Sequence, residues 1–578
     1  MAMSTRCIYE FDGFRLEPAE RLLTRSGRPV ALTPKIFDTL QVLVENSGRL
    51  ITKNEFMERV WRDAFVEEAT LAQSISQLRK AIGDADAIET VPKKGYRFTR
   101  KVEVIEQPSA AVSREPIRSI AVLPFRPLAQ NDRDESLEMG MADTLITVLS
   151  GIRKLLVRPM SSVRKYADSK MDTLAAGREL EVETVLEGSL QRQRNKVRVT
   201  ARLMRVSDGT SLWAGIFEQE MTDIFALQDT IASQLTQALS LELSNAEQLR
   251  LVKHYTQSAS AYQLYLKGRY YWWKNSPAEY NKSQAYFHRA VEEDPSYALG
   301  YCGLNSFYGY GAAWGMMPPE EGWPKAEWAV KKALEIDDQL AEAHLDMAAL
   351  KMVYYLDWPD TEREAKRAIE LSPGFDESHY AYSFFLMVQG RSREAIEEGQ
   401  RALECNPFSV RISQHLGYVF YCARQYDLAI RQYSKARELD GNDASVHQAL
   451  GDAYEQHGDF KGAVEAWTRA MLLNRETELI ELLGRGESRE AVERGLRSVA
   501  GKRLERLQHD RENGTYVPEM RFAREHLRAG NGEEAMRPMI AAVEERNVYA
   551  LIIATDPFYD PLRSNPYFTE LMKRMKLG

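Results

Sequence analysis

Cysteine is scarce in this 578-residue sequence, which contains four cysteines spaced far apart. No C-x-x-C pair occurs among Cys7, Cys302, Cys405 and Cys422. This spacing excludes a disulfide framework and a zinc knuckle, and it is typical of a reducing compartment. The chain also lacks a glycine-rich phosphate loop, a G-x-S-x-G elbow and an H-E-x-x-H motif. We therefore expect no enzymatic activity, no catalytic residue, no cofactor and no metal site.

Long hydrophobic runs are nearly as rare. The N-terminal residues MAMSTRCIYEF lack the apolar core of a secretory signal, so we expect a cytoplasmic protein. One stretch, Pro295 to Pro319, carries no charge over 25 residues and is long enough to span a bilayer. It contains five glycines, polar residues and terminal prolines, and it lies within a repeat pattern. We therefore expect no membrane span.

Charge is distributed unevenly along the chain, whose net charge is −8. Residues 1–105 contain 17 Lys and Arg against 15 Asp and Glu, so the acidity belongs to the rest of the chain. Residues 76–101 hold seven basic against three acidic side chains. A local basic edge on an acidic protein indicates an anionic partner at that one place.

The first hundred residues predict a small sheet followed by three helices. Short apolar runs broken at Asp12-Gly13 and Ser26-Gly27 are typical of antiparallel strands. The first helix is expected after Thr33 as N-cap, with Pro34 in its first turn. Thr52 and Glu55 form a capping-box pattern at the second helix. The third helix is expected over residues 68–82, with an apolar stripe of Leu71, Ile75, Leu78 and Ile82.

The face opposite that stripe carries small, amide-bearing and cationic side chains. Gln can bond adenine edges and Lys can reach guanine or phosphate, while small residues let a helix lie deep in the major groove. The alternative is an ordinary solvated face. The next element, IETVPKKGYRF, predicts a β-hairpin with Lys93 and Lys94 at its tip, which would lie beside the same duplex.

Residues 8–103 resemble the OmpR/PhoB-type winged-helix DNA-binding domain through LTPKIFDTLQVL, GRLITKNEFMERVW, ISQLRKAIGD and IETVPKKGYRF. The resemblance implies double-stranded DNA as the partner, read by the third helix and contacted by the hairpin as a wing. By position, the implied DNA-binding residues are Thr70, Ala72, Gln73, Ser76, Gln77, Arg79, Lys80, Lys93, Lys94 and Arg97. Arg79 lies toward the helix flank, where we expect it to contact a phosphate or a neighbouring acid.

The resemblance also implies an RNA polymerase contact in the loop between the second and third helices, here Trp61, Arg62 and Asp63. In classical members, which act in phosphorelay signal transduction, a receiver domain precedes the winged helix. This chain is expected to have none. Its domain order resembles that of bacterial CadC/ToxR-type regulators, which begin with the DNA-binding module. Those usually cross the membrane afterwards, which we do not expect here.

After a Pro/Ser/Ala-rich linker at residues 106–116, alternating strand and helix patterns predict an α/β domain over residues 117–245. The stretches IAVLPF, VLEGSLQRQRNKVRVTARLMRVSDGTSLWA and DIFALQDTIA resemble a TolB/FlgO-like domain. A row of arginines in it is either an anion site or the solvated face of a hairpin. The row consists of Arg192, Arg194, Arg198 and Arg202.

From about Ser258 the sequence repeats with a period near 34, marked by Pro373, Pro407 and Gly441. Small residues recur at fixed places in each unit, which resembles tetratricopeptide repeats. Histidines recur for the same reason, so we do not expect His344, His379 and His447 to share a metal ion. An early unit holds an insertion, expected at GMMPPEEGWPK. The tryptophans concentrated in this half are either inter-helix core or anchors for a peptide on a concave face.

The predicted fold class is multidomain: an α+β winged helix-turn-helix at 1–105, the linker, the α/β domain, and an all-α solenoid. The solenoid comprises repeats at 246–475 and degenerate repeats with a cap, DPFYDPLRSNPYF, at 476–578. The first functional hypothesis is a sequence-specific transcriptional regulator controlled by a protein, peptide or other ligand on the repeats, with homodimerisation as an option. The second is a signalling scaffold whose DNA binding is minor.

Overall fold

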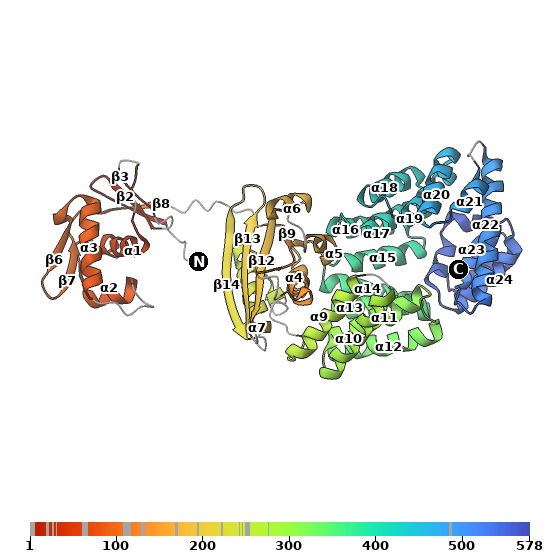
Figure 1. Cartoon of the computed structure of the whole chain (residues 1–578), viewed down its shortest axis with the longest axis horizontal. Helices are drawn as coiled ribbons and strands as arrows, with labels where there is room; N and C mark the ends of the chain where they lie inside the picture. Colours follow the sequence, from red (N-terminus) through yellow and green to blue (C-terminus); the bar gives the residue numbers. More distant parts are fainter. Residues whose placement is uncertain are drawn as a thin grey trace. The chain divides into compact units, whose positions relative to one another are not determined.

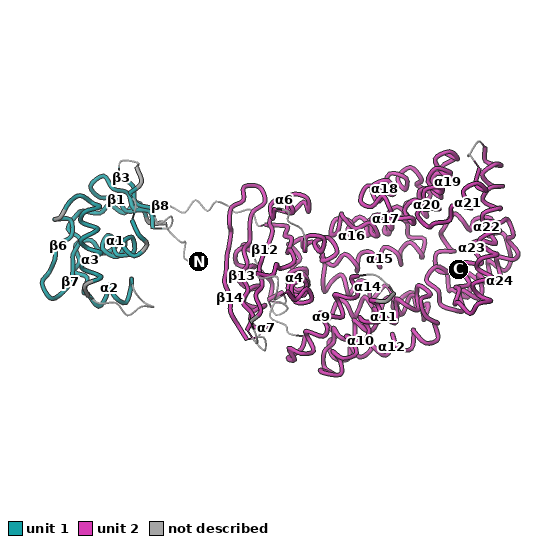
Figure 2. Tube along the Cα trace, viewed as in Figure 1, with its two compact units in different colours: residues 1–115 teal, residues 116–578 magenta. Residues whose placement is uncertain are grey.

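The chain divides into two compact units, Met1–Glu115 and Pro116–Gly578, each with its own hydrophobic core (Figure 2). The division falls within the predicted linker, of which residues 108–116 lie outside the described part of the chain. The computed structural model describes residues 6–18, 22–25, 28–30, 32–60, 68–107, 117–128, 133–167, 172–193, 196–220, 224–241, 243–245, 247–248, 255–274, 277–484 and 488–577.

Unit 1 combines α-helices with two antiparallel sheets, as predicted for a winged-helix module (Figure 1). One sheet has the strand order β4-β3-β2-β1-β8, and the other, which contains the hairpin, has the order β5-β7-β6. The elements are β1 Arg6–Phe11, β2 Phe14–Glu17, β3 Leu22–Arg25, β4 Arg28–Pro29, α1 Pro34–Glu45, β5 Leu50–Thr52, α2 Lys53–Val60, α3 Glu68–Ile82, η2 Ala85–Ala87, β6 Ile88–Val91, β7 Gly95–Phe98 and β8 Glu103–Gln107.

Local sequence sets the starts of the first two helices. Thr33 is the N-cap of α1 by position, although its side chain makes no capping hydrogen bond, and Pro34 follows in the first turn. The predicted capping box of α2 is confirmed. The N–H of Thr52 donates to Glu55 Oε2 (2.8 Å), and the N–H of Glu55 donates to Thr52 Oγ1 (3.2 Å). The hydrogen bonds that the Glu55 carboxylate accepts from the N–H and the hydroxyl of Thr52 hold its pKa below the ordinary value.

The predicted apolar stripe of α3 is also confirmed, since Leu71, Ile75, Leu78 and Ile82 are all buried in the core of unit 1. The strand β5 was not predicted, because three residues are too few to show a period of two. It pairs with β7 and closes the hairpin sheet on the side away from β6.

The first part of unit 2 is a mixed sheet with helices, as predicted for the middle region (Figure 1). The strand order is β11-β9-β12-β13-β14, with β10 paired to β12; the first three strands of the path are parallel and the last two antiparallel. The elements are β9 Ser119–Val122, β10 Arg126–Pro127, α4 Glu135–Ser150, β11 Leu156–Val157, α5 Met160–Val163, η4 Arg164–Tyr166, α6 Thr173–Glu179, β12 Thr184–Gln193, β13 Lys196–Arg205, β14 Ser211–Glu220 and α7 Ile224–Ala238.

The arginine row is divided between the two faces of this sheet. Arg192 is paired with buried Val197, whereas Arg198 and Arg202 alternate with the buried residues of β13 and point to the other face. Arg192 forms an ion pair with Asp134, and Arg202 does so with Glu187. Arg198 and Arg202 therefore fit the predicted solvated face of a hairpin; Arg194 lies outside the described residues.

Antiparallel helix pairs follow, with the predicted 34-residue period. First helices of neighbouring pairs contact one another more closely than second helices do, so the first helices line the inner face of the arc. The pairs are α9 Ala259–Trp273 with α10 Pro277–Glu293, α11 Ala298–Ala313 with α12 Pro319–Ile336, α13 Ala341–Leu350 (continued by the π-turn η6 Lys351–Tyr355) with α14 Trp358–Leu371, α15 Asp376–Val388 with α16 Ser392–Cys405, α17 Val410–Cys422 with α18 Tyr426–Leu439, and α19 Ala444–His457 with α20 Phe460–Leu473.

The recurring histidines have the structural role that the repeat phase predicted. Nε2 of His344, His379 and His447 lies 2.9–3.0 Å from the carbonyl oxygen six residues earlier, where it fastens the turn that enters the helix. No group of residues that could hold a metal ion occurs in the part of the chain that the structure describes.

The charge-free stretch Pro295 to Pro319 forms α11 and the turn into α12. No helix among the described residues has both the length and the apolar character needed to cross a bilayer. The predicted insertion lies at this turn and in the first turns of α12. Gly311 allows close packing there, because a Cβ on it would lie 2.6 Å from the Met317 side chain.

The tryptophans divide between the two expected roles. Trp323, Trp358 and Trp467 are buried between helices, whereas Trp314 and Trp328 are exposed. Exposed Trp314 packs edge to face against Tyr549, from the C-terminal segment of the same chain.

That C-terminal segment packs against the inner face of the repeats, although we predicted a terminal cap. The indole of Trp358 donates to the Met575 carbonyl (3.0 Å), and Tyr418 donates to Asp556 (2.6 Å). Both carboxylate oxygens of Asp560 accept from Arg424 (2.8 and 3.0 Å). The elements of this region are α21 Thr477–Leu483, α22 Arg489–Glu512, α23 Glu519–Arg528, α24 Gly532–Glu544, η7 Val548–Ala554, η8 Pro557–Leu562 and α25 Pro566–Arg574.

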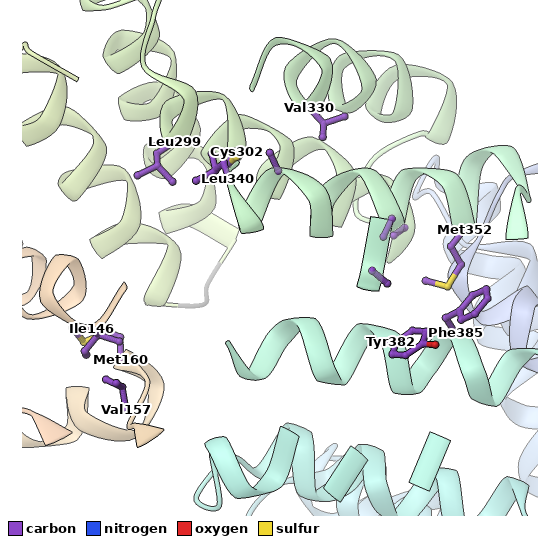
Figure 3. Close-up of a cluster of buried hydrophobic side chains, with 14 of the residues drawn as sticks. Ile146, Val157, Met160, Leu299, Cys302, Val330, Leu340, Met352, Tyr382 and Phe385 are labelled. Carbon is purple, nitrogen blue, oxygen red and sulfur yellow. The ribbon is translucent and has the colours of Figure 1, made fainter. Parts of the chain in front are cut away.

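The middle region and the repeats share one hydrophobic core. Figure 3 labels members of this cluster from the middle region, such as Ile146 and Val157, and from the repeats, such as Leu340 and Phe385. A single guanidinium group strengthens the junction. Buried Arg158 donates to the carbonyls of Leu180 (2.8 Å) and Glu181 (3.2 Å) in the middle region, and to two more at the C-terminal end of α16, those of Glu404 (2.8 Å) and Cys405 (3.2 Å).

Replacing Arg158 by alanine is expected to lower the free energy of unfolding of unit 2 by about 2–4 kcal/mol. The change leaves four carbonyls without this donor, two of them in buried hydrogen bonds and two in partly buried ones, and burial already shows its cost in a lowered pKa of the guanidinium. Urea denaturation of the full chain measures the effect. Arg393→Ala is the matched control, because the Arg393 side chain is 92% exposed and should change stability by less than about 0.5 kcal/mol. Equal effects would contradict the role of Arg158.

Candidate nucleic-acid interface

Helix α3 presents a continuous polar face on the side away from its core stripe. Thr70 is half-buried at the start of this face, and its carbonyl accepts a hydrogen bond from Ser74 (2.9 Å). The remaining predicted DNA-facing residues of the helix are exposed, namely Ala72, Gln73, Ser76, Gln77 and Lys80. A 15-residue helix with small and amide side chains on one face has the shape and donors that the major groove requires.

The wing tip is a tight turn whose backbone is fixed by its sequence. The N–H of Lys94 donates to the Val91 carbonyl (3.1 Å), Pro92 supplies the second position, and Lys93 takes a left-handed conformation with φ 62°. This is the pattern of a type II turn, in which the third position favours glycine. Lys93 and Lys94 are both exposed at the tip, as predicted.

Gly95 holds the wing against the rest of unit 1. A Cβ at this position would lie 1.9 Å from the Ile51 carbonyl oxygen, so only glycine allows β7 to approach β5 this closely. No role was predicted for Gly95. The signal was present in the K-K-G order of the tip, but the contact itself depends on β5, which was not predicted.

Arg79 connects the helix to the wing. Its guanidinium group donates to the Ile88 carbonyl (3.2 Å from Nε, with a second bond from Nη2) and to Thr90 Oγ1 (2.8 Å), both in β6. We expected Arg79 to contact a phosphate or a neighbouring acid. Its partners within the protein are instead a carbonyl and a hydroxyl of β6. Because the Arg79 side chain bonds α3 to β6, the helix and the wing present their exposed groups in one fixed geometry.

Arg97 lies on β7 with its guanidinium 3.3 Å from Glu89 Oε2, and its side chain is partly exposed. It is thus a weaker candidate for a phosphate contact than the two lysines at the tip, because an acid already shares its charge. The predicted polymerase-contact residues Trp61, Arg62 and Asp63 lie outside the residues that the structure describes.

Two protein families match this chain. Residues 27–98 match the family described as "Transcriptional regulatory protein, C terminal". Residues 116–254, which include the region predicted as TolB/FlgO-like, match "HilA/YgeH-like transcriptional regulator, second domain". The N-terminal module is thus a winged-helix DNA-binding domain of the OmpR/PhoB type.

Similar proteins include regulators with the same domain order. HilA of Salmonella typhi is 25% identical over 430 residues, which are 73% of this chain and 75% of HilA. CadC of Escherichia coli (strain K12), a transcriptional activator, is 35% identical over 86 residues, 14% of this chain and 17% of CadC. A Rhizobium meliloti (strain 1021) protein described as "Putative adenylate cyclase 3" is 28% identical over 242 residues, which are 41% of this chain and 41% of that protein.

Solved structures with local likeness include the DNA-binding domain of E. coli CadC, which is 29% identical and covers 18% of this chain and all of that one, with a TM-score of 0.16. YrrB, a tetratricopeptide-repeat protein, is 19% identical and covers 34% of this chain and 95% of its own, with a TM-score of 0.26.

Replacing Lys93 by glycine is expected to change stability and DNA binding differently. Glycine removes the cost of a left-handed conformation, so the free energy of unfolding should stay the same or rise by up to about 1 kcal/mol. Affinity for DNA should fall several-fold because a cation is lost from the tip. Thermal unfolding and fluorescence anisotropy measure the two effects. Lys93→Ala is the control: it should lose the same affinity without the gain in stability. Unchanged affinity in both variants would contradict a DNA contact at Lys93.

Replacing Arg79 by lysine is expected to weaken binding to all DNA sequences as much as Arg79→Ala does, because an ammonium group cannot reproduce the fork of bonds to Ile88 and Thr90. Hydrogen exchange should become faster in residues 88–98. Lys80→Ala serves as the comparison, since it should lower affinity without changing exchange in the wing. If Arg79→Lys binds DNA like the wild type, a positive charge at position 79 is sufficient and the hydrogen bonds to β6 are not needed for binding.

Proposed function

We propose that this protein is a cytoplasmic, sequence-specific DNA-binding transcriptional regulator and not an enzyme. The observation that carries the proposal is the exposed polar face of α3 fixed beside a wing with two exposed lysines by Arg79. The match of residues 27–98 to a family of transcriptional regulatory proteins supports it. The relatives HilA and CadC, named as a transcriptional regulator and a transcriptional activator, support it further.

The two parts of the interface are proposed to contribute differently. Lys93 and Lys94 at the wing tip supply affinity through the phosphate backbone, which carries no sequence information. Gln73 and Gln77 supply sequence choice, because an amide can pair with an adenine edge in the major groove. Arg79 is proposed to act mainly by positioning the wing. A contact between RNA polymerase and Trp61, Arg62 and Asp63 remains part of the proposal.

Unit 2 is proposed to receive the signal through a protein or peptide partner on its repeats. The inner face beside α15 and α17 is covered by Val548–Ala554 and Pro557–Leu562, and Met575, just after α25, is bonded to the start of α14. A partner would therefore use surface that this segment leaves open, of which exposed Trp328 is one apolar point.

A protein-assembly scaffold is the second candidate, and the long repeat region favours it. The two candidates differ in what the loss of unit 1 would do. A regulator loses promoter occupancy, whereas a scaffold retains its protein partners and its effect in the cell. Chromatin mapping of the full chain and of residues 116–578 therefore separates them.

Two double variants of the full chain test the division of roles. Lys93→Ala with Lys94→Ala should weaken binding to specific and random DNA alike, and should reduce the slope of log affinity against log salt by up to about 2. Gln73→Ala with Gln77→Ala should instead lower the ratio of specific to random binding, with each lost base contact contributing about 1–3 kcal/mol.

Fluorescence anisotropy across a salt series, with fragments selected from the genome, measures both effects. Asp510→Ala is a control far outside unit 1 and should match the wild type. The assignment fails if both double variants reduce specific and random binding equally. The functional proposal itself fails if the wild-type chain binds no DNA at low salt.

A further inference from the structure

The edge strand β14 of the middle sheet is long and unprotected. Nine of its ten residues pair with β13 along one side, with an irregularity at Leu212, and no strand in the described part of the chain pairs with the other side. Ser211 to Phe217 contains no charge and no proline. Natural sheets protect such edges with short strands, prolines or inward-pointing charges. The opposite edge follows this rule, because β11 has only two residues.

The strand is held rigid from one face. The Trp213 indole donates to Gln234 in α7 (3.1 Å), and the ring of Phe217 lies 6.0 Å from that of Trp213. The register with β13 continues from Leu203 opposite Trp213 to Lys196 opposite Glu220. The backbone donors and acceptors along the open edge are therefore already arranged for another strand.

The other face of the strand carries an apolar residue at its centre. Ile216 is 66% exposed, although large aliphatic side chains gain about 1.5–3 kcal/mol from burial. Its cross-strand partner is Thr200, and the neighbouring pairs on the same face are Ala214 with Arg202 and Glu218 with Arg198. An exposed isoleucine flanked by charged side chains on an unpaired edge has the composition of a protein interface, with an apolar centre and a charged rim.

We propose that β14 pairs antiparallel with β14 of a second copy of this chain, about a two-fold axis at Ile216. The charge pattern identifies this occupant. Antiparallel pairing places Glu218 and Glu220 of each copy beside the uncharged Ser211 end of the other. The nearest charges at that end are Arg205, whose N–H is bonded to the Thr210 carbonyl, and Asp208, with which Arg205 forms an ion pair (3.4 Å), so this end carries no net negative charge. Parallel pairing would instead set Glu218 and Glu220 against their own copies, which repels.

A two-fold pairing of identical edges is self-complementary and closes after two subunits, so it gives a dimer and not a fibre. The middle sheets of the two copies become one continuous sheet. Under the proposed function, which this consequence assumes, the dimer carries two DNA-binding modules and can bind two half-sites with an affinity raised by effective concentration.

The test measures the mass of the purified full chain by sedimentation velocity over a concentration series. The wild type should reach twice its monomer mass of 66.1 kDa. Ile216→Lys should raise the dissociation constant of the dimer by about tenfold or more, because two lysines meet at the axis. Leu128→Lys is the matched control: Leu128 is 55% exposed in the same region, on the side of β12 away from β13, and should leave the dimer intact.

Cross-linking tests the register. Ile216→Cys should form a disulfide between two copies under mild oxidation, because directly opposed Cβ atoms in an antiparallel pair lie about 4.5–5.5 Å apart. Leu128→Cys should not. Cys302, Cys405 and Cys422 are buried, which keeps their thiols out of the reaction.

A wild-type chain that stays monomeric at tens of micromolar would overturn the proposal, and the occupant of the edge would then be a different protein or unit 1 of the same chain. A dimer that Ile216→Lys does not weaken would place the interface elsewhere and would overturn it too. DNA binding distinguishes this failure from failure of the proposed function: a monomeric variant should still bind a single half-site.

Discussion

The guanidinium group of Arg79 bonds to the backbone of β6, and this contact makes one surface out of two separate elements. Without it, the exposed face of α3 and the tip of the wing would each be an ordinary polar surface. Gly95 fixes the other side of the hairpin, because it allows β7 to pair closely with β5. Lys93 and Lys94 therefore lie at the tip of a hairpin that is held on both sides. Affinity from the tip and selectivity from the helix therefore depend on the same few contacts.

Unit 2 uses an arginine in a similar way at a larger scale. Arg158 satisfies carbonyls at the end of α16, where a cation also opposes the partial negative charge of the helix terminus. Asn406, the next residue after α16, accepts from Ser162 (2.6 Å) and donates to Asp376 (2.7 Å). The middle region and the repeats are thus joined by these polar contacts in addition to a shared apolar core.

Periodic features of this chain were predictable, and contacts between distant segments were not. The stripe of α3 and the 34-residue interval follow from a repeating pattern of side chains, so sequence alone located these elements. Arg158 and Arg79 bond mainly to backbone carbonyls, which have no sequence signature, and Glu404 lies 246 residues from Arg158. The course of the C-terminal segment depends on the curvature of the whole arc, which no local pattern encodes. The same limit applies to the candidate site: side chains were assigned correctly to the exposed face, but the contact that orients the wing was not.

The shared core also restricts how a partner on the repeats could influence DNA binding. Displacing the C-terminal segment from the inner face would expose Ile553, Tyr559, Leu562 and Leu571, each buried and each contributing about 1.5–3 kcal/mol. The sum, on the order of 10 kcal/mol, approaches the whole binding energy of a nanomolar partner. A ligand shifts an equilibrium only by its differential affinity for the two states. Displacing the C-terminal segment would therefore consume nearly all of the partner's binding free energy. Bending at the junction would also break the hydrogen bonds of Arg158, at a further cost of about 2–4 kcal/mol. The proposed edge of β14 requires no such disruption, because its unpaired backbone and Ile216 are already exposed. If the proposed dimer forms, control of subunit association is the route by which a modest signal on unit 2 would reach the DNA-binding module.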